Sequence, residues 1–512
     1  MVSIPITEAF TQLESTQNQL ISVLSAFHDA CTQLYKTAVK IQSSHEIYKA
    51  LDDRLIQMNN QLDLLSVGEE KFAQSLAFLR RTRNISQTLV PINRLPAEIL
   101  ATVFELTVSG HKFASSIERG AQINPMATIP SVCQSWRQLA LRTPYLWSYI
   151  DLSGAMHTAS LNRAVLWAER SRQAPVHLRL EKYRFFETQD LAPELKNIST
   201  RAASFTFTSY SDEIYVRDLF NQYNSSGRSD TLKTIDIGPG QWPNILSSHF
   251  DWSAFVPNTL TTLKLCTTSE NITPTMDELM LLLSRTPNLR ALILRDVRVQ
   301  GSVPGASYPE AHLPHLEYLE SYPHRLTRPN YMGVTKCLMQ SIVPGSKDLE
   351  VWLEMGEAND EDHDSAMRKF CGRSRVTRLH TGYFKPDDHL PFTQYLDCLP
   401  ELQALSLDFD GEPTNDILDA LIVPGEGEEF SARCPKLQTL RISEACIIPQ
   451  SQVQLKRIVE AHELSSLILG DRAYFVDESG DHCDDAEIME WLREKVREVE
   501  VDQSITWFSL GA

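Results

Sequence analysis

The chain has 512 residues and a formal net charge of −18, from 48 basic and 66 acidic side chains. The charge is uneven, because residues 1–150 carry 13 basic and 12 acidic side chains, whereas the remaining 362 residues carry 35 and 54. An acidic surface of this size would repel a phosphate backbone, so nucleic-acid binding is excluded as the main role.

Neither a membrane span nor a disulfide framework is predicted. The longest apolar runs, such as LMLLL at 279–283, are only a few residues long, far short of the roughly 20 that cross a bilayer. The first residues, MVSIPITEAFTQL, lack the basic and apolar regions of a secretory signal. The nine cysteines include no CxxC pair, which predicts reduced thiols and a cytoplasmic and/or nuclear protein.

Residues 1–90 are predicted to form a helical coiled-coil leader. From about Thr7 to Asp63 the sequence contains no proline and repeats apolar residues every seven positions. All d positions are apolar: Leu13, Leu20, Phe27, Leu34, Ile41, Tyr48, Leu55 and Leu62. The a positions start apolar and become polar: Phe10, Gln17, Leu24, Cys31, Ala38, His45, Asp52 and Asn59.

A second helix of the leader is expected after Val67-Gly68, where Phe72, Leu76 and Leu79 share one face. The junction is placed near residues 66–70. The two helices can pair within one chain as a hairpin, or the leader can pair with another chain as a coiled coil. The sequence leaves both alternatives open, because polar a positions weaken either pairing.

Residues 91–152 are predicted to form a compact helical segment. Pro96 suits a first helical turn, and Glu98 complements the helix N-terminus. Apolar residues follow at helical spacing, and a polar loop over 109–125 separates them from a second helix around Trp136. Thr143-Pro144 ends that helix, because a residue before proline avoids the helical region. Trp136 and Trp147 are expected to serve the core, an interface or both.

The two halves of this segment, RLPAEILATVFELT and VCQSWRQLALRTPYLWSYIDL, resemble an F-box in the form abundant in mushroom-type fungi. A leader that ends in LVPINRLP is also typical of that group. Most F-box proteins are exchangeable specificity subunits of Skp–cullin–F-box ubiquitin ligases. The resemblance implies that residues 92–150 bind a Skp-family adaptor and, through it, a cullin. The docking residues that it implies are Leu95, Pro96, Ile99, Leu100, Phe104, Val132, Cys133 and Trp136.

Beyond residue 231 a short LxxLxL-like pattern recurs every 26 to 35 residues, for example LTTLKL at 260–265 and LQTLRI at 437–442. This period is typical of leucine-rich repeats, in which one short parallel strand and one helix form each repeat. Residues 231–512 are therefore predicted to form an irregular solenoid that binds a substrate, and residues 153–230 a linker with capping strands. The segment AEIMEWLREKVREVE at 486–500 is predicted to be a capping helix. The predicted fold is thus mixed α and α/β.

The residues between the leucines of each strand are expected to face outward on a concave sheet. Those predicted to contact a substrate are Thr262, Lys264, Ile293, Tyr318, Glu320, Ser406, Arg441 and Ser466. The excess of acidic over basic side chains is expected to lie on loops at 354–364, 425–429 and 477–487. Such loops would set the association rate and its salt dependence rather than hold the partner.

No motif for catalysis, phosphate binding or a metal is recognised. The turn GPGQW at 238–242 lacks the Walker spacing, and the acidic run at 477–487 lacks the glycine placement of a calcium loop. The chain is therefore expected to be an adaptor subunit with no catalytic site, cofactor or metal. One alternative function is a scaffold without ubiquitin transfer, in which the leader self-associates through residues 7–88 and the repeats bind a partner. Another is an enzyme in the acidic C-terminal half, which a pocket lined by convergent titratable groups would favour. The identity of the substrate is not predicted.

Overall fold

The computed structural model describes the chain apart from residues 1–2, 41–44, 86–89, 111–124, 153–157, 182–197, 209–218, 225–230, 239–250, 255–257, 267–272, 296, 298, 300–307, 323–327, 355–360, 383–388, 410–414, 426–429, 471–472, 477–485 and 502–512. It divides into two compact units, residues 1–96 and residues 97–512.

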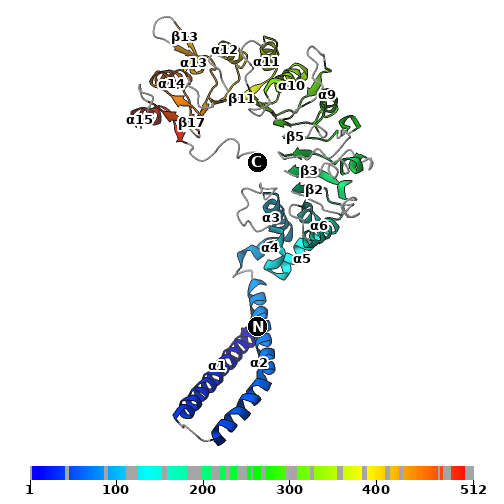
Figure 1. The fold of residues 1–512 in the computed structure, drawn as a ribbon, viewed down its shortest axis with the longest axis vertical. Coiled ribbons are helices and arrows are strands. Elements are labelled where there is room, and N and C mark those ends of the chain that lie inside the picture. Colours follow the sequence, from blue (N-terminus) through cyan, green and yellow to red (C-terminus); the bar gives the residue numbers. More distant parts are fainter. Residues whose placement is uncertain are drawn as a thin grey trace. The chain divides into compact units, whose positions relative to one another are not determined.

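The first unit consists of two long helices and a short 3-10 helix. They are α1 (Ser3–Lys40), α2 (His45–Ile85) and η1 (Pro91–Arg94), and Figure 1 shows α1 and α2 antiparallel. Two helices were predicted, but the predicted junction at 66–70 is wrong, because α2 runs through Gly68 without a break.

α2 begins at His45. The sequence SSHE at 43–46 has the S-x-x-E spacing that is typical of a helix start. Gly68 lies in an exposed part of α2, where a single glycine costs about 1 kcal/mol relative to alanine. The surrounding glutamate and leucine residues are good helix formers, so the helix tolerates it.

The second unit begins with a small helical segment, defined here as residues 97–152. Its elements are α3 (Ala97–Gly110), α4 (Pro125–Val132), α5 (Gln134–Arg142), η2 (Pro144–Trp147) and strand β1 (Tyr149–Asp151). Helix α3 packs against α4, α5 and η2. The predicted end of a helix before Pro144 is confirmed, because α5 ends at Arg142. Most of the predicted loop at 109–125 lies outside the described residues.

A parallel sheet forms the body of the second unit. In the described part of the chain it has thirteen strands, whose spatial order follows the sequence, so each strand pairs with its neighbours along the chain. After β1, the strands are β2 (Val176–Glu181), β3 (Ala202–Thr208), β4 (Thr234–Ile237), β5 (Thr262–Cys266), β6 (Ala291–Arg295), β8 (Tyr318–Tyr322), β10 (Leu349–Glu354), β11 (Val376–Gly382), β12 (Ala404–Asp408), β15 (Thr439–Ser443), β17 (Ser466–Leu469) and β19 (Glu498–Val501).

The strands are held in register by one continuous apolar row on the covered face. Side chains of this row are paired from strand to strand: Ile150, Leu178, Phe205, Ile235, Leu263, Leu292, Leu319, Val351, Leu379, Leu405, Leu440, Leu467 and Val499. All of them except Val499 are buried. Burying one such side chain contributes about 1.5–3 kcal/mol, and a shift by one residue would turn the whole row outward.

Helices connect the strands and cover this apolar row. They include α6 (Thr158–Arg170), α9 (Met276–Ser284), α10 (Arg328–Ser341), α11 (Glu361–Arg373), α12 (His389–Asp397), α13 (Asn415–Asp419), α14 (Pro449–His462) and α15 (Ala486–Lys495), with η3 (Trp252–Ala254). Figure 1 shows α9 to α14 along the outer side of a curve whose inner side is lined by the strands. The opposite face of the sheet, hereafter the inner face, is therefore the one without covering helices in this view.

Three small strand pairs complete the described structure. They are β7 (Ala311–Leu313) with β9 (Ile342–Pro344), β13 (Ile422–Pro424) with β14 (Phe430–Ala432), and β16 (Cys446–Ile447) with β18 (Tyr474–Phe475).

The expectation of a helix over 486–500 is wrong at its end, because α15 stops at Lys495 and residues 498–501 form β19. The physical reason is the alternating EVEV sequence, whose Val499 and Val501 continue the apolar rows beyond Leu467 and Leu469.

Candidate functional site

Helix α3 carries two apolar stripes, and one of them builds the helical segment. Leu100, Phe104 and Val108 recur every four residues and are buried. The rings of Phe104 and Trp136 lie 4.7 Å apart, with an interplanar angle of 57°. This contact ties α3 to α5, so the stripe is committed to the internal packing of residues 97–152.

The second stripe of α3 faces solvent. Ile99 is 51% exposed and Leu106 is 66% exposed, and Val103 between them is exposed as well. The spacing of these residues, i, i+4 and i+7, places them on one side of the helix next to the buried stripe. A helix that packs one apolar stripe internally and leaves an adjacent one uncovered has the form of a protein-docking surface.

The eight predicted docking residues divide between these two roles. Leu95, Pro96, Ile99 and Val132 are exposed, Cys133 and Trp136 are half-buried, and Leu100 and Phe104 are buried. Leu100 and Phe104 therefore belong to the packing that presents the surface. The predicted docking residues omitted Val103 and Leu106, although they lie four and seven residues after Ile99 in the same helical pattern.

Cys133 and Trp147 have clear structural roles. The Cys133 Sγ accepts a hydrogen bond from the Trp136 backbone N–H at 3.4 Å and caps the N-terminus of α5. Trp147 is buried, and its indole N–H donates to the Ala140 carbonyl at 2.7 Å. The Arg170 guanidinium lies 4.4 Å from the centroid of the Trp147 ring. Trp147 thereby joins the helical segment to α6.

The inner face of the sheet forms a second candidate surface. The paired residues of one row along this face are Asp151, Arg179, Thr206, Asp236, Lys264, Ile293, Glu320, Trp352, His380, Ser406, Arg441, Ile468 and Glu500. Charges of both signs, aromatic rings and small side chains alternate in it. Such a surface is suited to a protein partner rather than to one small ligand.

Ion pairs hold the charged side chains of this face in fixed positions. Arg295 binds Glu320 through both carboxylate oxygens, with the Arg295 Nη2 2.9 Å from the Glu320 Oε2. The Tyr318 hydroxyl donates to the same oxygen at 2.8 Å. Burial and the adjacent Glu320 charge raise the pKa of Tyr318. Burial alone would lower the pKa of Arg295, but the bond to Glu320 outweighs it and raises that pKa.

A second pair lies on β4 and β5. The Lys264 Nζ is 3.4 Å from the Asp236 Oδ1. Burial raises the pKa of Asp236, and the charge of Lys264 partly offsets this effect. Burial also raises the pKa of the neighbouring Cys266 thiol to about 12, so this thiol stays protonated at neutral pH and is a poor nucleophile.

An aromatic and charged group lies further along the inner face, on β10 and β11. The Trp352 and His380 rings stack with centroids 5.3 Å apart and an interplanar angle of 28°. The His380 Nε2 is 3.0 Å from the Glu350 Oε1, and the Arg378 Nη1 donates to the Glu350 Oε2 at 3.3 Å. The hydrogen bond from His380 is the main cause that lowers the pKa of Glu350.

Six of the eight predicted substrate residues are partly accessible on the inner face, and the other two are buried. Thr262, Lys264, Ile293, Tyr318, Arg441 and Ser466 are half-buried, whereas Ser406 is buried, contrary to the prediction. Glu320 is only 1% exposed, because Arg295 and Tyr318 enclose its carboxylate. Trp352 and His380 were missed, although the LEVWLE sequence at 349–354 has tryptophan at the position that faces outward in a strand.

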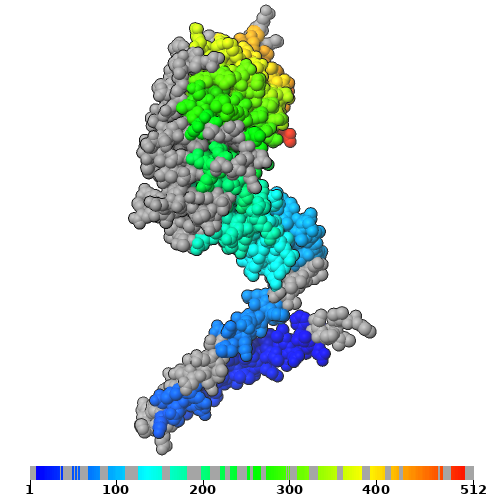
Figure 2. Space-filling view, turned by 90° about the vertical axis from the view of Figure 1, so that its right-hand side faces the viewer, coloured from blue at the N-terminus to red at the C-terminus, as the bar shows by residue number. Residues whose placement is uncertain are grey.

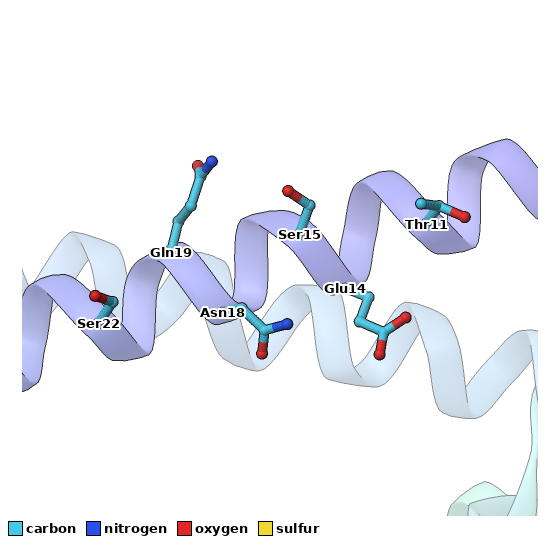
Figure 3. A pocket seen from close by; sticks show the side chains of 6 residues that line it. All are labelled: Thr11, Glu14, Ser15, Asn18, Gln19 and Ser22. Atoms are coloured by element: carbon cyan, nitrogen blue, oxygen red, sulfur yellow. The ribbon is translucent and has the colours of Figure 1, made fainter.

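The predicted acidic loops lie largely outside the described residues, which exclude 355–360, 426–429 and 477–485. The described residues contain no group of three or more His, Cys, Asp or Glu side chains that could hold a metal ion. No described helix is long and apolar enough to cross a membrane. A shallow depression of about 510 Å³ lies along α1, lined by Thr11, Glu14, Ser15, Asn18, Gln19 and Ser22 (Figure 3). Its lining side chains are short and polar and include one carboxylate, Glu14.

No protein-family model and no curated protein matches this chain.

Proposed function

We propose that the chain is an F-box substrate-recognition subunit of a Skp–cullin–F-box ubiquitin ligase. The observation that carries this proposal is the exposed stripe Ile99, Val103 and Leu106 on α3, beside the buried stripe that fixes the helix in place. In this proposal the Skp-family adaptor covers the exposed stripe. The resemblance of residues 94–107 and 132–152 to an F-box supports the assignment.

The energetics of this docking fit an exchangeable subunit. Each large apolar side chain that the adaptor covers contributes about 1.5–3 kcal/mol, and a handful of anchors dominate most protein interfaces. Because Leu100, Phe104 and Trp136 pack within the segment, the exposed residues are held in place before the adaptor arrives. Docking then requires little ordering of the subunit, which favours affinity.

The second part of the proposal concerns residues 231–512, taken as an irregular leucine-rich-repeat solenoid. Its inner face recruits a protein substrate through mixed charges and the aromatic residues Tyr318 and Trp352. Ubiquitin transfer is carried out by enzymes elsewhere in the complex, so this chain needs only two binding surfaces at a fixed spacing. Ten of the thirteen sequentially ordered parallel strands lie within residues 231–512, which supports a binding role for this region.

The test is an adaptor pull-down with the double variant Ile99→Ala, Leu106→Ala, which truncates two residues of the exposed stripe. Truncation of each interface anchor costs about 1–4 kcal/mol, so the variant is expected to lose the adaptor by orders of magnitude in affinity. A matched control is Val423→Ala with Val453→Ala, which truncates two exposed apolar side chains elsewhere in the chain. Retention of the adaptor by the first variant would refute the docking surface, provided that circular dichroism shows both variants folded.

A scaffold without ubiquitin transfer is the second candidate, and the exposed apolar residues of α1 favour it. Purification of the native complex distinguishes the two functions. A cullin recovered together with the chain supports the ligase subunit. Recovery of another partner without adaptor or cullin supports the scaffold.

A further inference from the structure

The seam of α1 is exposed in the chain alone. The apolar a and d residues Phe10, Leu13, Leu20, Leu24, Phe27 and Leu34 are each between 41% and 62% exposed. Exposed large apolar residues also occur on α2, among them Phe72 and Leu79. In the space-filling view of Figure 2, side chains of α1, in dark blue, lie at the surface along the helix. α2 therefore does not cover this seam, which stays open to another partner.

The opposite side of α1 is polar. Thr11, Ser15, Asn18 and Ser22 follow one another at spacings of three and four residues (Figure 3). At 100° per residue they lie on the side of the helix opposite Leu13, Leu20 and Leu24. The helix is thus sharply two-sided, and only one side is suited to burial.

The exposed area is sufficient for a stable interface. Ile21 and Val23 flank the six seam residues and are exposed as well. A side chain of this size exposes on the order of 100 Å² when about half of it faces solvent. The eight side chains together present about 800 Å², which equals the share of one partner in a standard protein interface.

One polar residue in the seam, Gln17, indicates what covers it. Gln17 and Cys31 occupy a positions. In a parallel, in-register pair each a residue faces its own copy, so Gln17 meets Gln17 and the two amides can hydrogen-bond to each other. An antiparallel or shifted arrangement would instead set the Gln17 amide against an apolar layer, where a polar group without a partner costs about 1–3 kcal/mol.

The charges on α1 permit the same pairing. Glu8, Asp29 and Lys36 occupy f positions and Lys40 occupies a c position, all away from the seam. Glu14 flanks the seam at an e position, and in a parallel pair it faces the g residue Ala9 of the other copy. No two like charges are therefore brought together across the interface.

We infer that α1 pairs with α1 of a second copy of this chain, in parallel and in register, so that the protein is a dimer. This inference does not depend on the proposed function, because the seam lies on α1 and the proposed docking stripe lies on α3. Each can fail while the other stands.

The first test is the mass of the full-length chain by light scattering after gel filtration. A dimer of the 58.1 kDa chain is expected. Leu20→Glu with Phe27→Glu places charges in the seam and should give the monomer. The matched control, Ser15→Glu with Ser22→Glu, places the same charges on the polar side and should remain a dimer. A monomeric wild-type chain at micromolar concentration, or a dimer that survives in the seam variant, would overturn the inference.

The second test fixes the register. Cys31 is exposed and lies in the seam, and a disulfide requires Cα atoms within about 4.4–6.8 Å of each other. Mild oxidation of the dimer should therefore link the two Cys31 side chains and give a covalent dimer on a non-reducing gel, which Cys31→Ser abolishes. A dimer that forms no such link would contradict the parallel register. Adaptor binding is measured on the same variants and should be unchanged.

Discussion

Arg295 on β6 and Glu320 on β8 form a bidentate ion pair in the middle of the inner face. The Glu320 side chain is 2% exposed, whereas that of Arg295 is 28% exposed. Because the two partners differ in access to solvent, the loss of one is expected to have a different effect from the loss of the other. When the cation is removed, a buried carboxylate has no water beside it to stabilise its charge.

Arg295→Met is therefore expected to destabilise the chain more than Glu320→Gln. Removal of one partner of a buried pair typically costs about 3–5 kcal/mol, and Glu320 would keep only the Tyr318 hydroxyl. Glu320→Gln leaves an arginine that solvent can reach and an amide that can still accept its N–H groups. Urea midpoints of the full chain measure the difference. Equal midpoints for the two variants would show that burial does not set the energetics of this pair.

Two glycine-to-alanine substitutions should have opposite effects. At Gly68 in α2 an added Cβ meets no atom within 4 Å, so Gly68→Ala should stabilise the helix by about 0.5–1 kcal/mol through its better propensity. At Gly382 the Cβ would lie 2.8 Å from the Asp408 backbone oxygen. Gly382→Ala should therefore destabilise the sheet by about 1–3 kcal/mol through overpacking. Thermal unfolding of both variants checks the two signs, and a stabilised Gly382→Ala chain would be inconsistent with the register of β11 and β12.

Stability is expected to fall below neutral pH through His462 at the end of α14. Burial lowers the pKa of His462, and its hydrogen bond to the Ile458 carbonyl at 3.1 Å partly opposes this effect. A histidine whose pKa is lower in the folded state binds its proton more tightly when unfolded. Its contribution is thus complete above the ordinary value of 6.5 and is lost as the pH falls toward the folded pKa.

His462→Gln tests this linkage. The variant should lose less stability than the wild-type chain between pH 7.5 and pH 5.5, because its side chain does not titrate. Other titrating groups contribute to both proteins and cancel in the comparison of urea midpoints. The same pH slope in both proteins would remove His462 as a cause.

The protein partner proposed for the inner face should be lost when one bulky charge is placed on that face. Ile468 lies half-buried on β17, and Val453 lies exposed on the neighbouring helix α14. Ile468→Arg should reduce recovery of co-purified substrate proteins, measured by quantitative mass spectrometry, because shape complementarity tolerates little intrusion. Val453→Arg adds the same charge outside the inner face and should leave recovery unchanged. The reverse result would place the substrate on the helical side.

The repeats were predictable because their signal is local. Each LxxLxL-like segment, from LKTIDI at 232–237 to LSSLIL at 464–469, contains or overlaps a strand of the sheet. Alternation with a period of two decides which side chains are buried within each segment, without reference to the rest of the chain. The same pattern did not predict the burial of Glu320, which depends on Arg295 from the preceding strand.

The candidate docking surface was predictable only in part. Helical spacing groups Ile99, Leu100, Val103 and Phe104, but it does not separate the stripe that packs against α5 from the one left to solvent. That division depends on where Trp136 lies in space. In the leader, the heptad pattern continues from α1 into α2, so the seven-residue periodicity alone did not predict that a new helix begins at His45.

The two ends of the sheet have a consequence for solubility. β1 and β19 are the outermost strands among the described residues, and each pairs on one side only. In the row that runs along the inner face, the terminal residues are Asp151 and Glu500, and Glu498 lies beside the latter on β19. Stacking one molecule on the next, end to end, would bring these carboxylates together, and like charges at open strand edges oppose such growth. The acidity of the chain thus acts at the points where an open parallel sheet is most prone to extend into fibres.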